Sequence, residues 1–229
     1  MTAPDGVPAW LERLVEALPH VGPEQLSRFP APEEGGRRSA VLILFGEGPD
    51  GPDLLFIERA ATMRSHAGQP AFPGGAQDPD DDGPVGAALR EAQEEVGLEP
   101  ASVQVLGVLP DLWLPPSGFL VAPVVAWWQT PHEVRVVDPA EVAAVVRVPL
   151  GELTDPANRV RVGHPNGWIG PAFEVRDLLI WGFTAALTDR LLTIGGWERP
   201  WDPSRIRPLD PLTAALAART AARPLPDLP

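Results

Sequence analysis

Runs of apolar residues, separated by turns rich in glycine, proline and aspartate, predict a series of β-strands along this chain. The segment 40–45 is apolar throughout and is typical of a buried strand, and 54–59 follows it across the turn 46–53 as its hairpin partner. The same criteria predict further strands at 102–109, at 119–128, in a run ending at Val148-Pro149-Leu150, and in a late hairpin formed by 159–162 and 168–175. Predicted strands therefore extend from residue 40 to residue 175.

Helical periodicity interrupts this pattern. A stripe of apolar residues recurs at the spacing of one helix face, formed by Val85, Ala88, Leu89, Ala92 and Val96. Gly97 follows at the point where a helix commonly ends in a left-handed residue. A second apolar helix is predicted at 180–192, and a short amphipathic one around 10–15.

Proline-rich ends frame these elements and suggest the domain boundaries. Residues 1–36 are expected to form an N-terminal extension, with its short helix on the domain surface, and residues 37–194 to form the main domain. Residues 195–229 are expected to form a Pro/Ala-rich C-terminal extension, linker-like apart from an Ala-rich helix at 212–222. The 229 residues, 44% of them hydrophobic, are enough for a sizeable core.

Charge and residue content exclude several classes of protein. The formal net charge of −13 argues against a non-specific nucleic-acid binder, which would carry a basic patch. The sequence has neither a long uninterrupted apolar run nor the basic start and apolar centre of a signal peptide, so no membrane association is expected. Because cysteine is absent, disulfides, thiolate catalysis and cysteine zinc sites are excluded, and the cytoplasm is the expected location.

Three glutamates on the first predicted helix suggest a metal site. Glu91, Glu94 and Glu95 are expected on the face opposite the apolar stripe, with their Cβ atoms within about 5–6 Å of one another. Such crowded carboxylates would repel one another, and a hard divalent cation such as Mg²⁺ would relieve the repulsion. An exposed acidic face is the ordinary explanation for a charge run. Here the glycine pair Gly74-Gly75, an acidic loop and Arg90 precede the glutamates in order, and this combination favours the metal site.

This segment resembles the Nudix box, G-x5-E-x7-R-E-U-x-E-E-x-G-U. Its second half is matched by Arg90, Glu91, Ala92, Glu94, Glu95, Gly97 and Leu98. In the first half aspartate replaces glutamate: counting forward from Gly75 reaches Asp81, the preferred match, and counting back from Arg90 reaches Asp82. The resemblance implies an α/β protein with the Nudix fold, an α/β/α sandwich around a mixed β-sheet. It also implies a Mg²⁺ or Mn²⁺ cofactor held by Glu91, Glu94, Glu95 and the carbonyl of Gly74.

The residues before the box resemble the signature of the coenzyme A pyrophosphatase subfamily, L-L-T-x-R-[SA]-x3-R-x3-G-x3-F-P-G-G. Its charged, glycine and aromatic positions are matched by Arg59, Arg64, Gly68 and Phe72, which the resemblance implies are substrate-binding residues. Phe56 and Ile57 depart from the signature, an apolar change within a predicted strand. Guanidinium groups form forked bonds with phosphate oxygens, which suits a substrate with a diphosphate and a 3′-phosphate.

Later segments supply further candidates. The stretch around Glu141 resembles a family region that assists the metal or the attacking water, so Glu141 joins Glu91, Glu94 and Glu95 as a catalytic candidate. The general base is left open among Glu91, Glu94 and Glu141. Trp113 or Phe119, in a loop that resembles the one closing over the site, is a candidate for stacking an adenine, with core packing as the alternative.

The predicted function is hydrolysis of coenzyme A or acyl-coenzyme A to 3′,5′-ADP and 4′-phosphopantetheine or its acyl form. One alternative is the same chemistry on another nucleoside diphosphate derivative, such as ADP-ribose or NADH. A second is a catalytically silent nucleotide-binding module. The expected partner is the small nucleotide substrate, and the oligomeric state is left open between a monomer and a homodimer.

Overall fold

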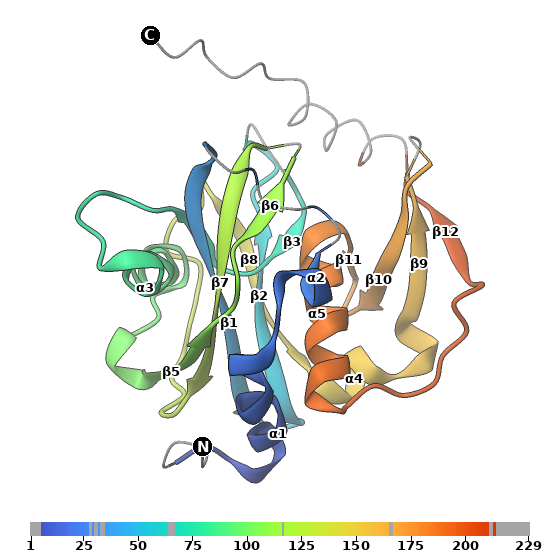
Figure 1. The fold of residues 1–229 in the computed structure, drawn as a ribbon, viewed down its shortest axis with the longest axis horizontal. Coiled ribbons are helices and arrows are strands. Elements are labelled where there is room, and N and C mark those ends of the chain that lie inside the picture. Colours follow the sequence, from blue (N-terminus) through green and yellow to red (C-terminus); the bar gives the residue numbers. More distant parts are fainter. Residues whose placement is uncertain are drawn as a thin grey trace, which may run out of the picture.

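The computed structural model describes residues 6–27, 29, 32, 35–63, 67–115, 117–164, 167–210 and 213. Its centre is a mixed β-sheet (Figure 1) made of β1 (Arg37–Gly48), β2 (Gly51–Arg59), β3 (Pro70–Ala71), β4 (Gly74–Ala76), β5 (Val103–Val108), β6 (Leu112–Leu114), β7 (Phe119–Trp128) and β8 (Val142–Pro149). The predicted hairpin is confirmed, because β1 and β2 pair antiparallel from Phe45 and Leu54 to Gly48 and Gly51.

Strand β1 lies at the middle of this sheet. It pairs in parallel with β7, with Arg37 opposite Phe119 and Phe45 opposite Trp127, while the other pairs in the sheet are antiparallel. Short strand β4 takes the place beside residues 39–41 of β1 that β2 leaves free. Continuous apolar sequence in β1 and β7 fits their burial on both faces.

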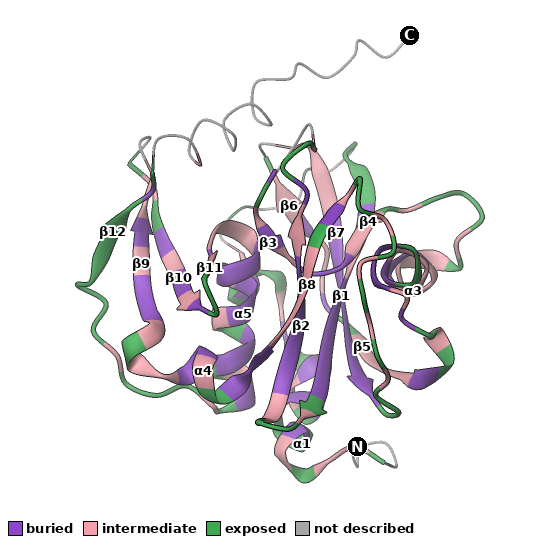
Figure 2. Ribbon diagram, turned by 180° about the vertical axis from the view of Figure 1, so that it is seen from behind, coloured by how far each residue is buried: buried purple, intermediate pink, exposed green. Residues whose placement is uncertain are grey.

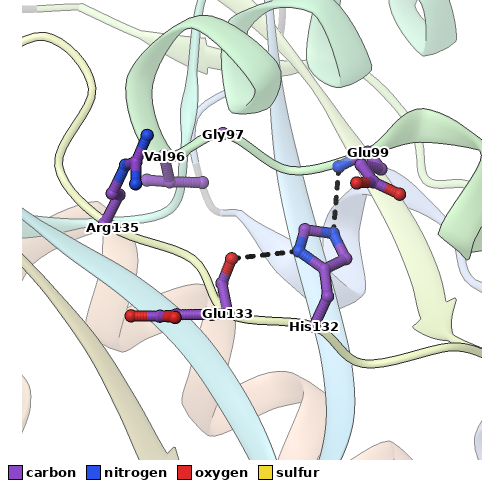
Figure 3. A pocket seen from close by; sticks show the side chains of 6 residues that line it. All are labelled: Val96, Gly97, Glu99, His132, Glu133 and Arg135. Atoms are coloured by element: carbon purple, nitrogen blue, oxygen red, sulfur yellow. Dashed lines mark hydrogen bonds between the residues drawn. The ribbon is translucent and has the colours of Figure 1, made fainter.

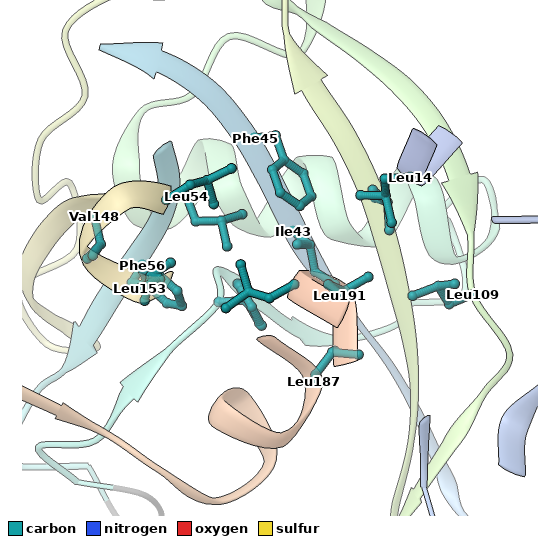
Figure 4. Packing of buried hydrophobic residues seen from close by; sticks show 14 of the residues in the cluster. Leu14, Ile43, Phe45, Leu54, Phe56, Leu109, Val148, Leu153, Leu187 and Leu191 are labelled. Atoms are coloured by element: carbon teal, nitrogen blue, oxygen red, sulfur yellow. The ribbon is translucent and has the colours of Figure 1, made fainter. Parts of the chain in front are cut away.

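Helices cover both faces of the sheet, so the predicted α/β/α sandwich is confirmed (Figure 1). Helix α3 (Gly83–Val96) packs on one face, where Leu42, Leu44, Leu55 and Ile57 meet Ala88, Ala92 and Val96. Helices α1 (Ala9–Ala17) and α5 (Gly182–Gly195) pack on the other face. Figure 4 shows that core, in which Leu14, Leu187 and Leu191 contact a cluster that includes Ile43, Phe45, Leu54 and Phe56. Alternation along β1 and β2 therefore divides the apolar side chains between two cores.

A second, smaller sheet lies beyond α5. It contains β11 (Leu178–Ile180), β10 (Ile169–Val175), β9 (Arg159–Gly163) and β12 (Ile206–Pro208), in that order. Strands β9 and β10 form the late hairpin predicted from the sequence. Its outer strand β12 is exposed along its length, whereas β9 and β10 are largely buried (Figure 2). The remaining elements are α2 (Pro23–Leu26), α4 (Leu150–Thr154) and the 3-10 turns Leu18–His20, Pro100–Ser102 and Pro156–Asn158.

Both ends of the chain pack onto the rest of the fold. Helix α1 buries its apolar face, where Leu11 and Leu14 are fully buried among residues of the sheet and α5, while its polar face is exposed. At the other end β12 pairs in parallel with β9, so residues 206–208 form a strand rather than a linker. The predicted helix at 212–222 falls outside the described residues except for Thr213. Within the described ranges, no helix has the length and apolar character needed to cross a bilayer.

Candidate active site

The glutamates of α3 do not share one face, which corrects the expectation from the sequence. Glu95 is only 2% exposed and faces the sheet, and the Glu91 side chain is largely buried beside β4. The Glu94 side chain is 60% exposed and turns to solvent. Successive residues of a helix are rotated by about 100°, so Glu94 and Glu95 diverge while Glu91 and Glu95, four residues apart, stay together.

Two glycines of β4 allow this strand to lie close to β1 and to α3. Gly74 has a φ of +153°, and a Cβ there would lie 2.3 Å from the carbonyl oxygen of Ala40. A Cβ on Gly75 would lie 2.5 Å from the carboxyl group of Glu91. The backbone N–H of Gly74 donates a hydrogen bond to Oε2 of Glu95 at 3.0 Å. The glycine pair therefore makes room for one carboxylate and directly orients the other.

Burial changes the protonation of Glu95. Desolvation raises its pKa to about 8, against the opposing effects of the Gly74 hydrogen bond and the nearby Arg59 charge. The charges of Glu91 and Glu141 contribute to this rise in pKa. Oε1 of Glu95 is buried and meets no hydrogen-bond partner among the described residues. Burial also raises the pKa of Glu91, opposed by Arg90.

Arg90 holds the acidic loop and the helix together. Its guanidinium group donates to Oδ1 and Oδ2 of Asp81 at 2.9 and 3.0 Å, and to the carbonyl of Ala76. It also donates to Glu91 at 3.1 Å and to Glu94 at 3.0 Å. Through these contacts Arg90 orients the carboxylates of Asp81, Glu91 and Glu94. The hydrogen bond from Arg90 holds the pKa of Asp81 below its ordinary value.

The same contacts distinguish the two aspartates in the first half of the box. Asp81 is the buried partner of Arg90, whereas Asp82 occupies the N-cap position of α3. Asp81, the residue reached by counting forward from Gly75, is therefore the aspartate of this loop that contacts Arg90.

Arg59 and Glu141 reach the site from the other side. Arg59 ends β2, where a bulge shifts the register with β8 between Glu58 and Arg59. The Arg59 charge acts on Glu95, and its buried Nε meets no hydrogen-bond partner in the described part of the chain. The backbone carbonyl of Glu141 accepts a hydrogen bond from the N–H of Ala60 at 2.7 Å, which ties Glu141 to the end of the same strand.

The other predicted substrate residues are not gathered in the same way. Phe72 is 2% exposed and stacks on Phe56 with 5.1 Å between ring centroids, so its ring fills the core instead of facing a substrate. Gly68 has a φ of +67° and donates its N–H to the carbonyl of Arg59, which closes the loop after β2. Arg64 lies outside the described residues.

The two candidates for stacking an adenine, Trp113 and Phe119, lie where β6 and the first residues of β7 pair. The guanidinium of Arg37 lies 4.1 Å from the ring centroid of Phe119. The ring of Trp113, on β6, lies against Gly36: a Cβ added to Gly36 would be 3.1 Å from this ring. Both rings are partly exposed, so they are not simply core residues.

The donor set suits a hard divalent cation, because it consists of carboxylates and one of them has a buried oxygen with no hydrogen-bond partner in the described part of the chain. Among the residues that the structure describes, however, no three acidic or histidine side chains are gathered as a preformed metal site. Glu94 is instead paired with Arg90, and Glu95 accepts from the N–H of Gly74. To bind an ion, Glu94 would have to break its hydrogen bond with Arg90. Otherwise Glu91 and Glu95 would have to hold the ion without Glu94.

Sequence reasoning missed the segment between β7 and β8. The backbone N–H of Val137 donates to the carbonyl of Glu95 at 3.0 Å, so this segment fixes the helix at the residue that bears the buried carboxylate. Its signal in the sequence is an alternation in which Val134 and Val136 pack inward between exposed residues.

Comparisons with known proteins were made on the sequence and on the fold. The model of the NUDIX domain matches residues 36–166. The uncharacterized Nudix hydrolase NudL of Cronobacter sakazakii is 42% identical over 171 residues, which cover 72% of this chain and 85% of that protein. The NudL of Photorhabdus laumondii is 44% identical over 175 residues, covering 73% and 91%. The crystal structure of a Nudix hydrolase from M. smegmatis, RenU, is 21% identical with a TM-score of 0.48, covering 77% of this chain and 96% of that one.

Proposed function

The chain belongs to the Nudix hydrolase family, and from this premise we propose that it hydrolyses the diphosphate of coenzyme A or acyl-coenzyme A. The products would be 3′,5′-ADP and 4′-phosphopantetheine or its acyl form. Nudix hydrolases act on phosphoric anhydrides and generally use divalent ions such as Mg²⁺ or Mn²⁺. The choice of coenzyme A among such substrates is the proposal.

The observation that carries this proposal is the position of Arg59 beside the carboxylates. Arg59, Glu95 and Glu141 come from different elements, yet the charges of Arg59 and Glu141 both act on the buried Glu95, and the carbonyl of Glu141 accepts the N–H of Ala60 next to Arg59. A diphosphate needs both kinds of group, because the carboxylates hold cations and a guanidinium binds phosphate oxygens directly. Arg59 is also the first arginine in the sequence signature of the coenzyme A subfamily, which supports that substrate over other diphosphates.

The chain's own residues divide the work of hydrolysis. Glu91, Glu94, Glu95 and the Gly74 carbonyl would hold the ion, and Glu95 is oriented for this by the N–H of Gly74. A bound divalent ion supplies Lewis acidity, which neutralises phosphoryl oxygens and lowers the pKa of water. Arg90 keeps Glu91 in place through a hydrogen bond, and Arg59 binds the diphosphate.

The proton of the attacking water passes to a carboxylate as the new phosphorus–oxygen bond forms and the anhydride bond breaks. Of the candidates for this base, Glu94 is turned to solvent, with a side chain that is 60% exposed. Glu91 and Glu141 remain, and the charge of Glu141 acts on Glu91.

The test is a substrate panel with identification of the products by mass. The purified protein is incubated with Mg²⁺ and coenzyme A, acetyl-coenzyme A, ADP-ribose, NADH or nucleoside triphosphates. Release of 3′,5′-ADP from coenzyme A in preference to cleavage of the others supports the proposal. Cleavage of ADP-ribose or NADH with coenzyme A left intact would show that another nucleoside diphosphate derivative, and not coenzyme A, is the substrate. No turnover of any compound would favour a catalytically silent binding module.

Substitution of Arg59 sharpens this test. We expect Arg59→Ala to reduce kcat/KM for coenzyme A by about 10- to 100-fold, which corresponds to the loss of a charged hydrogen bond of about 1.5–3 kcal/mol. The matched control is Arg13→Ala, an exposed arginine on α1 across the sheet, which should leave kcat/KM unchanged. Equal kinetics for Arg59→Ala and the control would contradict a role of Arg59 in substrate binding.

A further inference from the structure

Residues 129–141, here called the strap, connect β7 to β8 and lie along the end of α3. The backbone N–H of Arg135 donates to the carbonyl of Val96 at 3.1 Å, and that of Val137 donates to the carbonyl of Glu95 at 3.0 Å. Carbonyls in the last turn of a helix have no partner within the helix. The strap supplies these partners and so fixes the backbone of Glu95 from outside the helix.

The far end of the strap delivers Glu141 to the same site. The carbonyl of Asp138 accepts hydrogen bonds from the N–H groups of Glu141 and Val142, and Oδ1 of Asp138 accepts one from Ala140. This turn leads directly into β8, and the carbonyl of Glu141 accepts the N–H of Ala60 next to Arg59. One segment therefore sets the positions of two carboxylates of the site, Glu95 and Glu141.

The near end of the strap is fastened by His132 (Figure 3). Nε2 of His132 accepts a hydrogen bond from the backbone N–H of Glu99 at 3.1 Å, and Nδ1 lies 3.0 Å from the carbonyl oxygen of Glu133. An amide N–H can only donate and a carbonyl can only accept, so the ring is neutral with its hydrogen on Nδ1. The bond to Glu99 links the strap to the segment that follows α3, whereas the bond to Glu133 is local.

The surroundings of His132 make this bond important. The edge of its ring meets Trp128 at 5.3 Å between centroids, and the Trp128 indole N–H donates to Ser102, whose hydroxyl donates to the carbonyl of Glu99. On the other side a hollow of about 220 Å³ lies between the strap and the end of α3, lined by Val96, Gly97, Glu99, His132, Glu133 and Arg135. At this end the backbone N–H of Thr130 also donates to the carbonyl of Ser102 at 3.3 Å. Beside the hollow, the imidazole adds the side-chain link from the strap to the segment that follows α3.

We propose that His132 is a positioning residue for hydrolysis, which holds the strap against α3 and thereby sets Glu95 and Glu141 relative to each other. The inference rests on the proposed function for its effect on turnover. Its effect on the strap itself is independent of any activity.

Two amide variants separate the two bonds of the ring. In His132→Gln the side-chain oxygen reaches the place of Nε2 and can accept from Glu99. In His132→Asn the shorter side chain reaches only the place of Nδ1. It therefore keeps the hydrogen bond to the carbonyl of Glu133 and loses the one from the N–H of Glu99. We expect His132→Asn and His132→Ala to lower kcat by about tenfold or more with KM changed much less, since small displacements of catalytic groups cost up to about 100-fold. His132→Gln should retain most of the turnover, and His20→Ala, at an exposed histidine, should behave as the wild type.

Amide hydrogen exchange, measured by NMR without substrate, provides the second measurement. The N–H groups of Arg135 and Val137 should exchange about tenfold faster in His132→Asn and His132→Ala than in the wild type and His132→Gln, because local opening exposes them. Unchanged exchange in all variants, or equal loss of kcat in His132→Gln and His132→Asn, would overturn the proposal. If the wild type hydrolyses no diphosphate, the proposed function fails, and exchange alone decides whether His132 holds the strap.

Discussion

Glu95 illustrates how one residue combines a structural cost with a function. Its carboxylate is buried against β4, and a single backbone N–H satisfies only one of its oxygens. A buried charge with incomplete hydrogen bonding destabilises a fold unless it is neutralised by a proton or paired with a cation. The proton and the divalent ion therefore compete for the same group.

This competition predicts a pH dependence of stability in the absence of metal. The pKa of Glu95 is about 8 in the folded protein against an ordinary 4.5, so the unfolded chain loses this proton first. The stabilising contribution is complete below pH 4.5, falls as the pH rises, and is lost above about pH 8. We expect the Tm in EDTA to fall across this window, and the Glu95→Gln variant to show a flatter profile. Thermal unfolding at several pH values measures both.

A control variant and added Mg²⁺ test whether Glu95 causes the fall in Tm. Glu94→Gln should keep the slope of the wild type, because the Glu94 side chain is 60% exposed. Excess Mg²⁺ should raise the Tm of the wild type most at high pH, where the ionised carboxylate binds the cation. An identical pH profile for Glu95→Gln and the wild type would show that Glu95 is not the source of the dependence.

At the scale of elements, the sequence predicts the strands well because their signal is local. The apolar runs at 40–45 and 119–128 lie within β1 and β7, and the stripe from Ala88 to Val96 is the buried face of α3. The rotation of Glu95 towards the sheet was missed, since it depends on the depth at which α3 packs. That depth is set by glycines in β4, a strand of three residues with little periodic signal of its own.

How deeply the apolar face of α1 is buried could not be predicted from the sequence for a related reason. Its sequence is amphipathic and short, which is compatible with a surface location as well as with a core location. Only the tertiary structure shows that Leu14 fills space between the sheet and α5. The same limit applies to residues 206–208, where a strand forms because β9 offers an edge.

Because α1 is packed against the core, shortening one of its buried side chains should greatly lower the free energy of unfolding. Leu14 is fully buried, so Leu14→Ala should lower the free energy of unfolding by about 2–5 kcal/mol through lost burial and a cavity. Glu16→Ala, at an exposed position of the same helix, should change it by less than about 0.5 kcal/mol. Urea denaturation measures both values. Similar free energies for the two variants would mean that α1 is an appendage.

At the scale of the whole molecule, one buried ion pair joins three parts of the chain. Arg159 at the start of β9 is fully buried and pairs with Asp189 on α5. Its guanidinium lies between the rings of Phe173 and Trp201, 4.7 Å from each centroid. Burial lowers the pKa of Arg159 and raises that of Asp189, so each charge depends on the other. The pair connects the second sheet, the helix beside it and the C-terminal segment.

Removing one member of this pair should be worse than removing both. Asp189→Asn leaves the Arg159 charge buried without its counterion, which should cost about 3–5 kcal/mol of unfolding free energy. The double variant Arg159→Met, Asp189→Leu replaces the pair with apolar groups and should be closer to the wild type. Chemical denaturation of the two variants checks this order. A double variant less stable than Asp189→Asn would indicate that the pair itself is favourable.

The parallel pairing of β1 with β7 also determines when the protein can fold. Strand β1 is made early in synthesis, but its central neighbour begins only at Phe119, and the helix that covers its other face begins at Gly182. A nascent chain that ends before Phe119 therefore exposes an apolar strand with an open edge. Such long-range contacts slow folding and expose unfinished chains to aggregation. The interval between the synthesis of β1 and that of β7 is therefore the period in which the unfinished chain is most exposed to aggregation.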